Sequence, residues 1–131
     1  PDTADTIDLS SFDYIVDAID TVSAKLTLIV RAKEAGVPII SCMGTGNKLG
    51  VNFEVCDIYK TSVCPLAKVM RKELKARGVN DLKVVYSKQS PLIPKDTPSE
   101  KGRHIPGSIC YAPAIAGMII ASEVIKDIAK L

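Results

Sequence analysis

Two aspartates lie three residues apart at the end of a short strand pattern, in the stretch Phe12–Lys25 (FDYIVDAIDTVSAK). Tyr14–Val16 has strand character, and a helical pattern begins directly after Asp20 and Thr21. In an open parallel α/β sheet, ligands bind at such strand-to-helix junctions. Asp17 and Asp20 are therefore candidates for a metal or phosphate site. The alternative is that Asp17 ends the strand while Asp20 or Thr21 caps the helix, as Asp and Thr often do.

The elements that must position these aspartates form a β-α-β pattern. The apolar face of the expected helix ends before Gly36 and Pro38, and it consists of Val22, Leu26, Ile29 and Val30. Val37–Cys42 (VPIISC) is a nearly continuous apolar run, typical of a strand that is covered on both faces. The pattern predicts two parallel strands joined by a helix.

A glycine-rich segment follows at Gly44–Gly50 (GTGNKLG) and invites comparison with a dinucleotide-binding loop. Its third glycine comes one place too late for the G-x-G-x-x-G fingerprint, and the residues that follow (VNFEVCDI) alternate like a strand rather than opening a helix. We therefore predict a strand-connecting turn in which the glycines supply positive φ angles.

A second helix is predicted after Pro65, ending at Gly78, and a further strand at Leu82–Tyr86. The apolar face of this helix consists of Leu66, Val69, Met70 and Leu74, and the opposite face carries Lys68, Arg71, Lys72 and Lys75. This basic stripe has the spacing to follow a nucleic acid backbone, and a solvated helix face is an equally good interpretation.

The last part of the chain combines a proline-rich segment with an apolar helix pattern. Ser87–Ser108 contains four prolines and is predicted to be a long loop, a length that is typical of functional or disordered segments. The final helix, predicted from Pro113 to Leu131, is apolar on nearly all sides through Ile120. Such a helix is expected to be buried, either in the core or against another subunit.

Composition sets the broad class. A chain of 131 residues with 47% hydrophobic and 24% charged residues has the composition of a folded domain or part of one. Its net charge of +2 does not by itself indicate binding to nucleic acid. The four cysteines form no C-x-x-C pair, which argues against a structural zinc site and a disulfide-stapled secreted module, and favours the cytoplasm. The polar start has no signal-peptide character, and the longest apolar run is too short to span a membrane.

Several motifs, taken in order, resemble the ThiF/MoeB/HesA superfamily of ubiquitin-activating-like adenylyltransferases. They are DAIDT, VPIISCMGTGNKL, VCDIYKTSVCPLAKVMRKELK and PAIAGMIIASEVIK. Asp57–Lys68 matches the D-I-x-K-T-x-x-x-P-L-A-K pattern of the branch that dehydrates threonylcarbamoyl adenosine in tRNA. One departure is LGVNFEV after Lys48, where relatives tend to have a longer L-D-P-x-x-F-x-V.

The resemblance implies an α/β fold that corresponds to the C-terminal half of a Rossmann-like ThiF-type domain. Parallel strands come first, antiparallel strands follow, and a helix closes the domain. Residues 1–131 are then a single partial domain without the N-terminal nucleotide-binding unit, and we expect the fragment alone to be inactive. The segment 87–108 corresponds to the crossover loop of the family.

The implied activity is ATP-dependent adenylation of a carboxylate, with magnesium, followed by ring closure as AMP leaves. Asp20 falls on the family's magnesium-associated aspartate and is the expected catalytic and metal-binding residue, while Asp17 holds the loop. Thr21 and Lys25 contact the nucleotide or pair with Asp20, with capping and a solvated lysine as alternatives. The resemblance also implies tRNA as partner and a homodimer, with the basic stripe and Arg103 as substrate contacts.

Two other functions remain open from the sequence. One is activation of a ubiquitin-like sulfur-carrier protein, with a sulfur-transfer partner; zinc-binding C-x-x-C pairs would favour it, and none is present. The other is a non-catalytic dimerisation module. Cys64 and Cys110 lie near functional segments, but free cysteine is commonly a small buried apolar residue, so no thiol nucleophile is assigned. The single histidine, His104, is expected to be an exposed loop residue.

Overall fold

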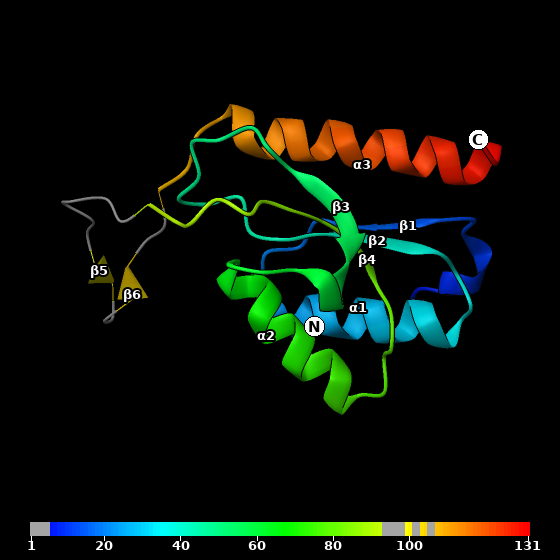
Figure 1. Ribbon diagram of the computed structural model, residues 1–131. Helices are drawn as coiled ribbons and strands as arrows, with labels where there is room; N and C mark the ends of the chain where they lie inside the picture. Colours follow the sequence, from blue (N-terminus) through cyan, green and yellow to red (C-terminus); the bar gives the residue numbers. More distant parts are fainter. Residues whose placement is uncertain (1–5, 93–98, 101–102, 105–106) are drawn as a thin grey trace.

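The computed structural model describes residues 6–92, 99–100, 103–104 and 107–131. A four-stranded sheet lies at the centre, with α1 and α2 on one face and α3 on the other (Figure 1). The strand order is β1-β2-β4-β3, in which the first three strands are parallel and β3 is antiparallel to β4. This arrangement confirms the predicted α/β fold with parallel strands, an antiparallel strand and a closing helix.

The element boundaries follow the predicted patterns closely. The sheet strands are β1 (Ile15–Asp17), β2 (Ile39–Cys42), β3 (Glu54–Asp57) and β4 (Lys83–Tyr86). The helices are α1 (Val22–Glu34), α2 (Pro65–Ala76) and α3 (Tyr111–Ala129), with short 3-10 turns η2 (Leu9–Ser11) and η3 (Ile58–Lys60). Two further two-residue strands, β5 (Ser99–Glu100) and β6 (Arg103–His104), form a separate antiparallel pair.

Strand register explains how the sheet presents its ligand-binding edge. Asp17 at the end of β1 is opposite Ser41 of β2, and Ser41 in turn is opposite Val84 of β4. The carboxyl ends of these three parallel strands therefore meet at one edge of the sheet, where ligands bind in open α/β folds. The central strands are buried on both faces, as the fully buried Ile40, Val84 and Val85 show, which accounts for their continuous apolar sequence.

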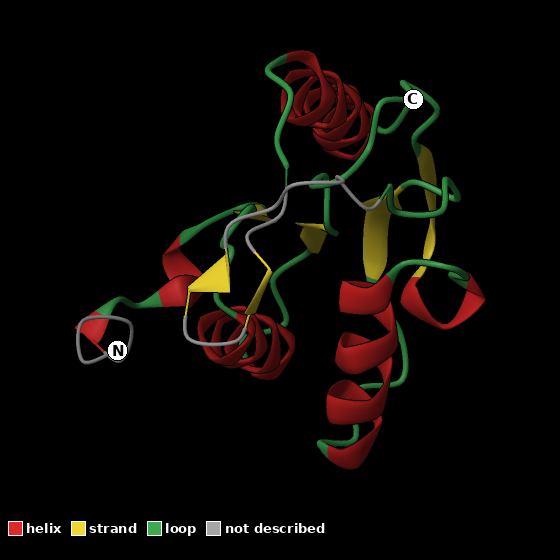
Figure 2. Ribbon diagram, turned by 90° about the vertical axis from the view of Figure 1, so that its left-hand side faces the viewer, coloured by secondary structure: helices red, strands yellow, loops and turns green. Residues whose placement is uncertain are grey.

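The core has two layers, one on each face of the sheet, and Figure 2 shows the helices that lie on the two sides of the sheet. On one face of the sheet, α1 and α2 bury apolar side chains that include Ile29, Met70 and Leu74. On the other face, α3 packs Ala116 and Ile120 against Ile40 and Val85. The small alanines let this helix lie close to the sheet.

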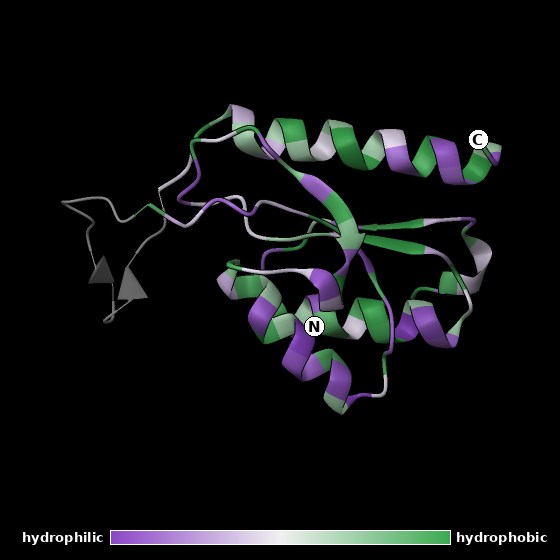
Figure 3. Cartoon of the chain, viewed as in Figure 1, coloured by the Kyte–Doolittle hydropathy of each residue, from purple (hydrophilic) through white to green (hydrophobic). Residues whose placement is uncertain are grey.

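One prediction about an apolar helix face is corrected, and for the closing helix complete burial in the core of this chain is excluded, while burial against another subunit stays a prediction. Val69 is 46% exposed, because it faces the surface groove between α1 and α2 rather than the core. The closing helix is not buried all round: only Ala112, Ala116 and Ile120 are buried, while Met118 is 76% exposed. The reason is geometric, because a single sheet covers only one side of α3, whose apolar residues continue around its surface (Figure 3).

The loops also depart from prediction. In the glycine-rich turn the residue with positive φ is Asn47 (φ 56°), and not Gly44, Gly46 or Gly50. The turn links β2 to β3, which are separated by β4, so it is no hairpin. The predicted loop at residues 87–108 contains the short pair β5 and β6. Residues 93–98, 101–102 and 105–106 of the expected crossover segment lie outside the described residues.

Within the described ranges, no helix has both the length and the apolar character that a bilayer crossing requires.

Candidate functional site

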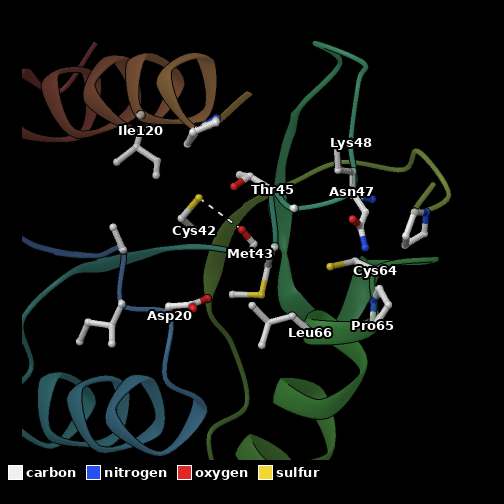
Figure 4. Close-up of a pocket in the computed structure, with 17 residues that line it drawn as sticks. Asp20, Cys42, Met43, Thr45, Asn47, Lys48, Cys64, Pro65, Leu66 and Ile120 are labelled. Carbon is white, nitrogen blue, oxygen red and sulfur yellow. Dashed lines mark hydrogen bonds between the residues drawn. The ribbon is translucent and has the colours of Figure 1, made fainter. Parts of the chain in front are cut away.

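A cavity of about 610 Å³ opens at the carboxyl ends of β1 and β2 (Figure 4). Its walls come from the loop after β1, the glycine-rich turn after β2, the start of α2 and the first half of α3. Most lining residues are apolar or glycine, and the polar side chains among them are Asp20, Thr45, Asn47 and Lys48, with the thiols of Cys42 and Cys64. The cavity lies where the strand-to-helix junction predicted a ligand site.

Asp20 lines this cavity from the bend between β1 and α1. Its side chain is exposed and makes no hydrogen bond or ion pair with any residue in the described part of the chain. A carboxylate in this state is available to a ligand.

The donor set allows only one kind of magnesium site. The described residues contain no cluster of three or more His, Cys, Asp or Glu side chains, so this part of the chain offers no all-protein metal cage. Magnesium is usually held by one or two carboxylates together with phosphate oxygens and water. Asp20 therefore fits a magnesium ion that is shared with a bound phosphate.

Asp17 has a different role, because it is fully buried. Its Oδ2 lies 2.8 Å from Nζ of Lys25 and accepts a hydrogen bond of 2.5 Å from Oγ of Ser41. Its Oδ1 accepts a hydrogen bond of 3.0 Å from the backbone N–H of Ile19. Asp17 thus holds the loop that carries Asp20 into the cavity.

The structure places Lys25 and Thr21 away from the predicted contacts. Lys25 is fully buried, pairs with Asp17 and donates a 2.8 Å hydrogen bond to the carbonyl of Cys42. It is neither solvated nor paired with Asp20, and it does not line the cavity. Thr21 is the N-cap residue of α1 but forms no side-chain capping bond, and it is also absent from the cavity wall.

Lys48 is a cavity residue that the sequence reasoning missed. It is only 4% exposed, and Nζ donates hydrogen bonds to the backbone carbonyls of Ser87 (3.4 Å) and Gln89. No carboxylate among the described residues lies within ion-pair distance of it. Burial lowers the pKa of Lys48. The only signal in the sequence was a lysine within a glycine-rich turn.

Asn47, next to Lys48, fastens two distant parts of the chain. Its backbone N–H donates to the carbonyl of Gly107 (2.8 Å), and its Oδ1 accepts from the N–H of Gly107 (2.6 Å). Its carbonyl accepts from the N–H of Leu92 (2.8 Å). The described residues on either side of segment 93–106 are therefore joined at the cavity wall by one residue.

The start of α2 forms another wall, through Cys64, Pro65 and Leu66. Cys64 is the N-cap residue and makes no side-chain capping bond. Because these first residues of α2 line the cavity, the positive end of the helix dipole lies at this wall. Just before it, Val63 has a φ of 62°, a strained conformation for a β-branched residue.

The cysteines show no activated thiol. All four are free. Burial raises the pKa of the Cys42 thiol, which lines the cavity and is thereby kept in its neutral, less nucleophilic form. Cys64 is buried, as a small apolar residue would be, and Cys110 is exposed.

The predicted basic stripe is reduced to three lysines. Lys68, Lys72 and Lys75 are exposed on α2. Arg71 instead turns towards η3 and donates to the carbonyl (3.0 Å) and the hydroxyl of Thr61, so it is not part of the solvent-facing stripe. Arg103 lies in β6, and its side chain is outside the described part of the structure.

Comparison with known proteins gives a consistent relationship. No family model matches the chain. A tRNA threonylcarbamoyladenosine dehydratase of Bacillus subtilis is 34% identical over 130 residues, which cover 90% of this chain and 51% of that protein. The tRNA threonylcarbamoyladenosine dehydratase 2 of Saccharomyces cerevisiae is 38% identical over 81 residues, covering 60% of this chain and 18% of that protein.

Solved structures agree in fold. The Escherichia coli tRNA N6-threonylcarbamoyladenosine dehydratase, TcdA, in complex with AMP superimposes with a TM-score of 0.76 at 25% identity, over 91% of this chain and 50% of that chain. The same protein in complex with ATP gives a TM-score of 0.77 at 24% identity, over 98% of this chain and 51% of that one, which shows the shared fold.

The present chain spans about half the length of the curated relatives it matches. The resemblance drawn from its motifs is confirmed. Over about 90% of its length, this chain is thus similar in sequence and in fold to part of the tRNA threonylcarbamoyladenosine dehydratases.

Proposed function

We propose that the intact protein catalyses ATP-dependent dehydration of threonylcarbamoyl adenosine in tRNA, and that this chain is the C-terminal part of the enzyme. The observation that carries the proposal is the free carboxylate of Asp20 in a cavity at the carboxyl ends of parallel strands. The relatives named for this reaction, and a related structure that contains AMP, support it.

The reaction begins when the substrate carboxylate attacks the α-phosphate of ATP and pyrophosphate leaves. The resulting acyl-adenylate loses AMP as the ring closes, so that one water is removed overall. When bound, magnesium neutralises charge on the phosphate oxygens. Asp20 is the residue of this chain that would hold the ion.

The apolar part of the cavity wall has a separate task. Ile19, Met43, Leu66 and Ile120 line it, and we infer that a substrate bound against them would be partly shielded from water. An acyl-adenylate is readily hydrolysed, so such shielding would favour ring closure over hydrolysis.

The partners follow from two exposed surfaces. We infer that the α2 lysines Lys68, Lys72 and Lys75 contact tRNA phosphates, and that the exposed apolar side of α3 forms a homodimer contact. We propose that the segment 87–108, with Arg103, is a crossover segment beside the path of the substrate. We also propose that the enzyme is cytoplasmic.

The test uses the intact protein with ATP, magnesium and tRNA that carries threonylcarbamoyl adenosine, with the nucleosides analysed by mass spectrometry. We expect the nucleoside to lose the mass of one water with the wild type and with Asp13→Ala, an exposed carboxylate outside the cavity. Asp20→Ala should abolish the loss. An unchanged nucleoside mass, together with pyrophosphate exchange that depends on a small carrier protein, would instead assign the protein to the sulfur-carrier class.

A further inference from the structure

The cavity contains one buried cation that the proposed reaction does not yet use. Lys48 is 4% exposed, and its described partners are two neutral backbone carbonyls, those of Ser87 and Gln89. Buried charges in proteins are normally paired with an opposite charge. Within the described residues, Lys48 has no such partner.

The number of N–H donors on Lys48 also indicates that a partner is missing. A lysine ammonium has three N–H donors, and two of them are used by the carbonyls of Ser87 and Gln89. The third has no acceptor in the part of the chain that the structure describes. Lys48 lines the cavity, so a ligand there can supply both the missing acceptor and the missing negative charge.

A second positive feature shares this wall of the cavity. The N-terminus of α2, at Cys64 and Pro65, has no side-chain cap and adds the positive end of its dipole. Asp20 lies on the other side of the cavity, next to the start of α1 (Figure 4). The cavity therefore has an acidic side, suited to a metal ion, and a basic side, suited to an anion.

We propose that Lys48 binds an anionic oxygen group of the ligand, a phosphate or a carboxylate, across the cavity from Asp20. The identity of the ligand rests on the proposed function, in which both groups occur: the phosphates of the nucleotide and the carboxylate of the modified tRNA. The shared chemistry is a charge-assisted hydrogen bond from ammonium to oxyanion.

A purely structural role makes a different prediction. Lys48 also joins the glycine-rich turn to the loop after β4, where the backbone N–H of Gly50 donates to Oε1 of Gln89 (2.6 Å). If bracing this junction were its whole purpose, replacing Lys48 would change stability and leave ligand affinity untouched. Glutamine is the informative replacement, because it keeps a neutral N–H donor for the carbonyls and removes the charge.

The experiment measures binding of AMP, ATP and inorganic pyrophosphate to the intact protein by titration calorimetry, and the KM for tRNA that carries threonylcarbamoyl adenosine. The variants are Lys48→Gln and the control Lys60→Gln, an exposed lysine outside the cavity. We expect Lys48→Gln to weaken binding of the ligand that contacts Lys48 at least about tenfold, as for the loss of other hydrogen bonds to charged groups. Lys60→Gln should match the wild type.

The outcomes separate the possible ligands from the bracing role. Weaker binding of AMP, ATP or pyrophosphate assigns Lys48 to a nucleotide phosphate, and a higher KM for the modified tRNA with unchanged nucleotide affinity assigns it to the carboxylate. Unchanged nucleotide affinities and KM, in a Lys48→Gln protein that folds, would overturn the inference and leave the dehydratase proposal standing. If the wild type binds nucleotide or pyrophosphate through Lys48 but does not dehydrate tRNA, only the proposed function fails.

Discussion

At the scale of single residues, Asp17 and Asp20 show how environment separates two identical side chains three residues apart. Asp17 is fully buried between Lys25 and Ser41, while Asp20 is exposed and faces the cavity without a described partner. The first therefore contributes to folding, and the second is available for ligand chemistry.

Removal of the charge should destabilise the fold strongly at Asp17 and hardly at all at Asp20. Asp17→Asn leaves the buried ammonium of Lys25 without its counter-charge, and we expect the free energy of unfolding to fall by about 3–5 kcal/mol. Asp20→Asn should change it by less than about 0.5 kcal/mol, because the side chain is exposed. Urea unfolding of both variants measures this difference, and equal losses of stability would contradict these assignments.

At the scale of the elements, α3 is fastened to the sheet by polar contacts at its C-terminal end as well as by its apolar face. Lys83 of β4 contacts Asp127 (2.7 Å) and Glu123 (3.3 Å), and the hydroxyl of Tyr14 donates to Asp127 (2.7 Å). The hydrogen bonds from Lys83 and Tyr14 lower the pKa of Asp127 below its usual value of 3.8.

This contact predicts an acid dependence. Because the pKa of Asp127 is lower in the folded state, its contribution to stability is complete above the unfolded pKa and is lost as the pH falls through the folded pKa. We expect Asp127→Asn to be less stable than the wild type at neutral pH and to lose less stability on acidification below pH about 4. Unfolding followed between pH 7 and pH 3 tests this, and parallel pH curves would contradict it.

At the cavity wall, Asn47 joins distant parts of the chain through its hydrogen bonds to Gly107 and Leu92. Asn47→Ala loses the acceptor of the Gly107 N–H and places alanine at a positive φ, so we expect the free energy of unfolding to fall by about 1–2 kcal/mol. Asn47→Asp keeps the side-chain acceptor and serves as the matched control, with stability close to the wild type. If both variants lost the same stability in denaturant unfolding, the side-chain bond would not be the cause.

At the scale of the whole molecule, the surface has a basic region and an apolar region that no other described part of the chain covers. Lys68, Lys72 and Lys75 form an exposed basic stripe on α2. On α3, Met118, Ile125 and Ile128 are each more than half exposed. These surfaces lie on opposite faces of the sheet, so the tRNA and the second subunit that we propose as partners would not compete for the same face.

The basic stripe predicts a salt dependence of tRNA binding. Replacing all three lysines by glutamine removes up to three phosphate contacts, so the slope of log affinity against log salt should become shallower by about 2. The control neutralises Lys33, Lys88 and Lys130, which lie outside the stripe, and should keep the wild-type slope. Filter binding at several salt concentrations gives both slopes; an unaltered slope in the stripe variant would leave α2 as a solvated face.

The apolar side of α3 predicts the oligomeric state. We expect Met118→Glu combined with Ile125→Glu to turn a homodimer into a monomer, because two charges would have to be buried in the contact. Sedimentation velocity of the intact protein measures the change, with Ala76→Glu at the exposed end of α2 as control. A wild-type protein that is monomeric at all concentrations, or a double variant that remains dimeric, would contradict this assignment.

Much of the fold was predictable because the relevant signals are local in the sequence. The apolar run of β2 and the periodic face of α1 predicted a β-α-β unit, and the position of Asp20 after the first strand pointed to the cavity edge. The same local signals misplaced Val69, and they did not decide whether α3 is covered by the core or by another subunit, because an apolar pattern does not show how much of a helix its own domain can cover.

Only the tertiary structure decided the partners of the polar residues. Lys25 pairs within the β1–α1 unit, but Lys48 reaches carbonyls 39 and 41 residues away and Asn47 reaches Gly107, 60 residues away. Such pairings depend on which loops the sheet brings to the same edge, and no local periodicity records that. The sequence by itself therefore determined the strands, the helices and the aspartate at their junction, and the tertiary structure decided which charges are buried, which remain free and where a ligand can meet them.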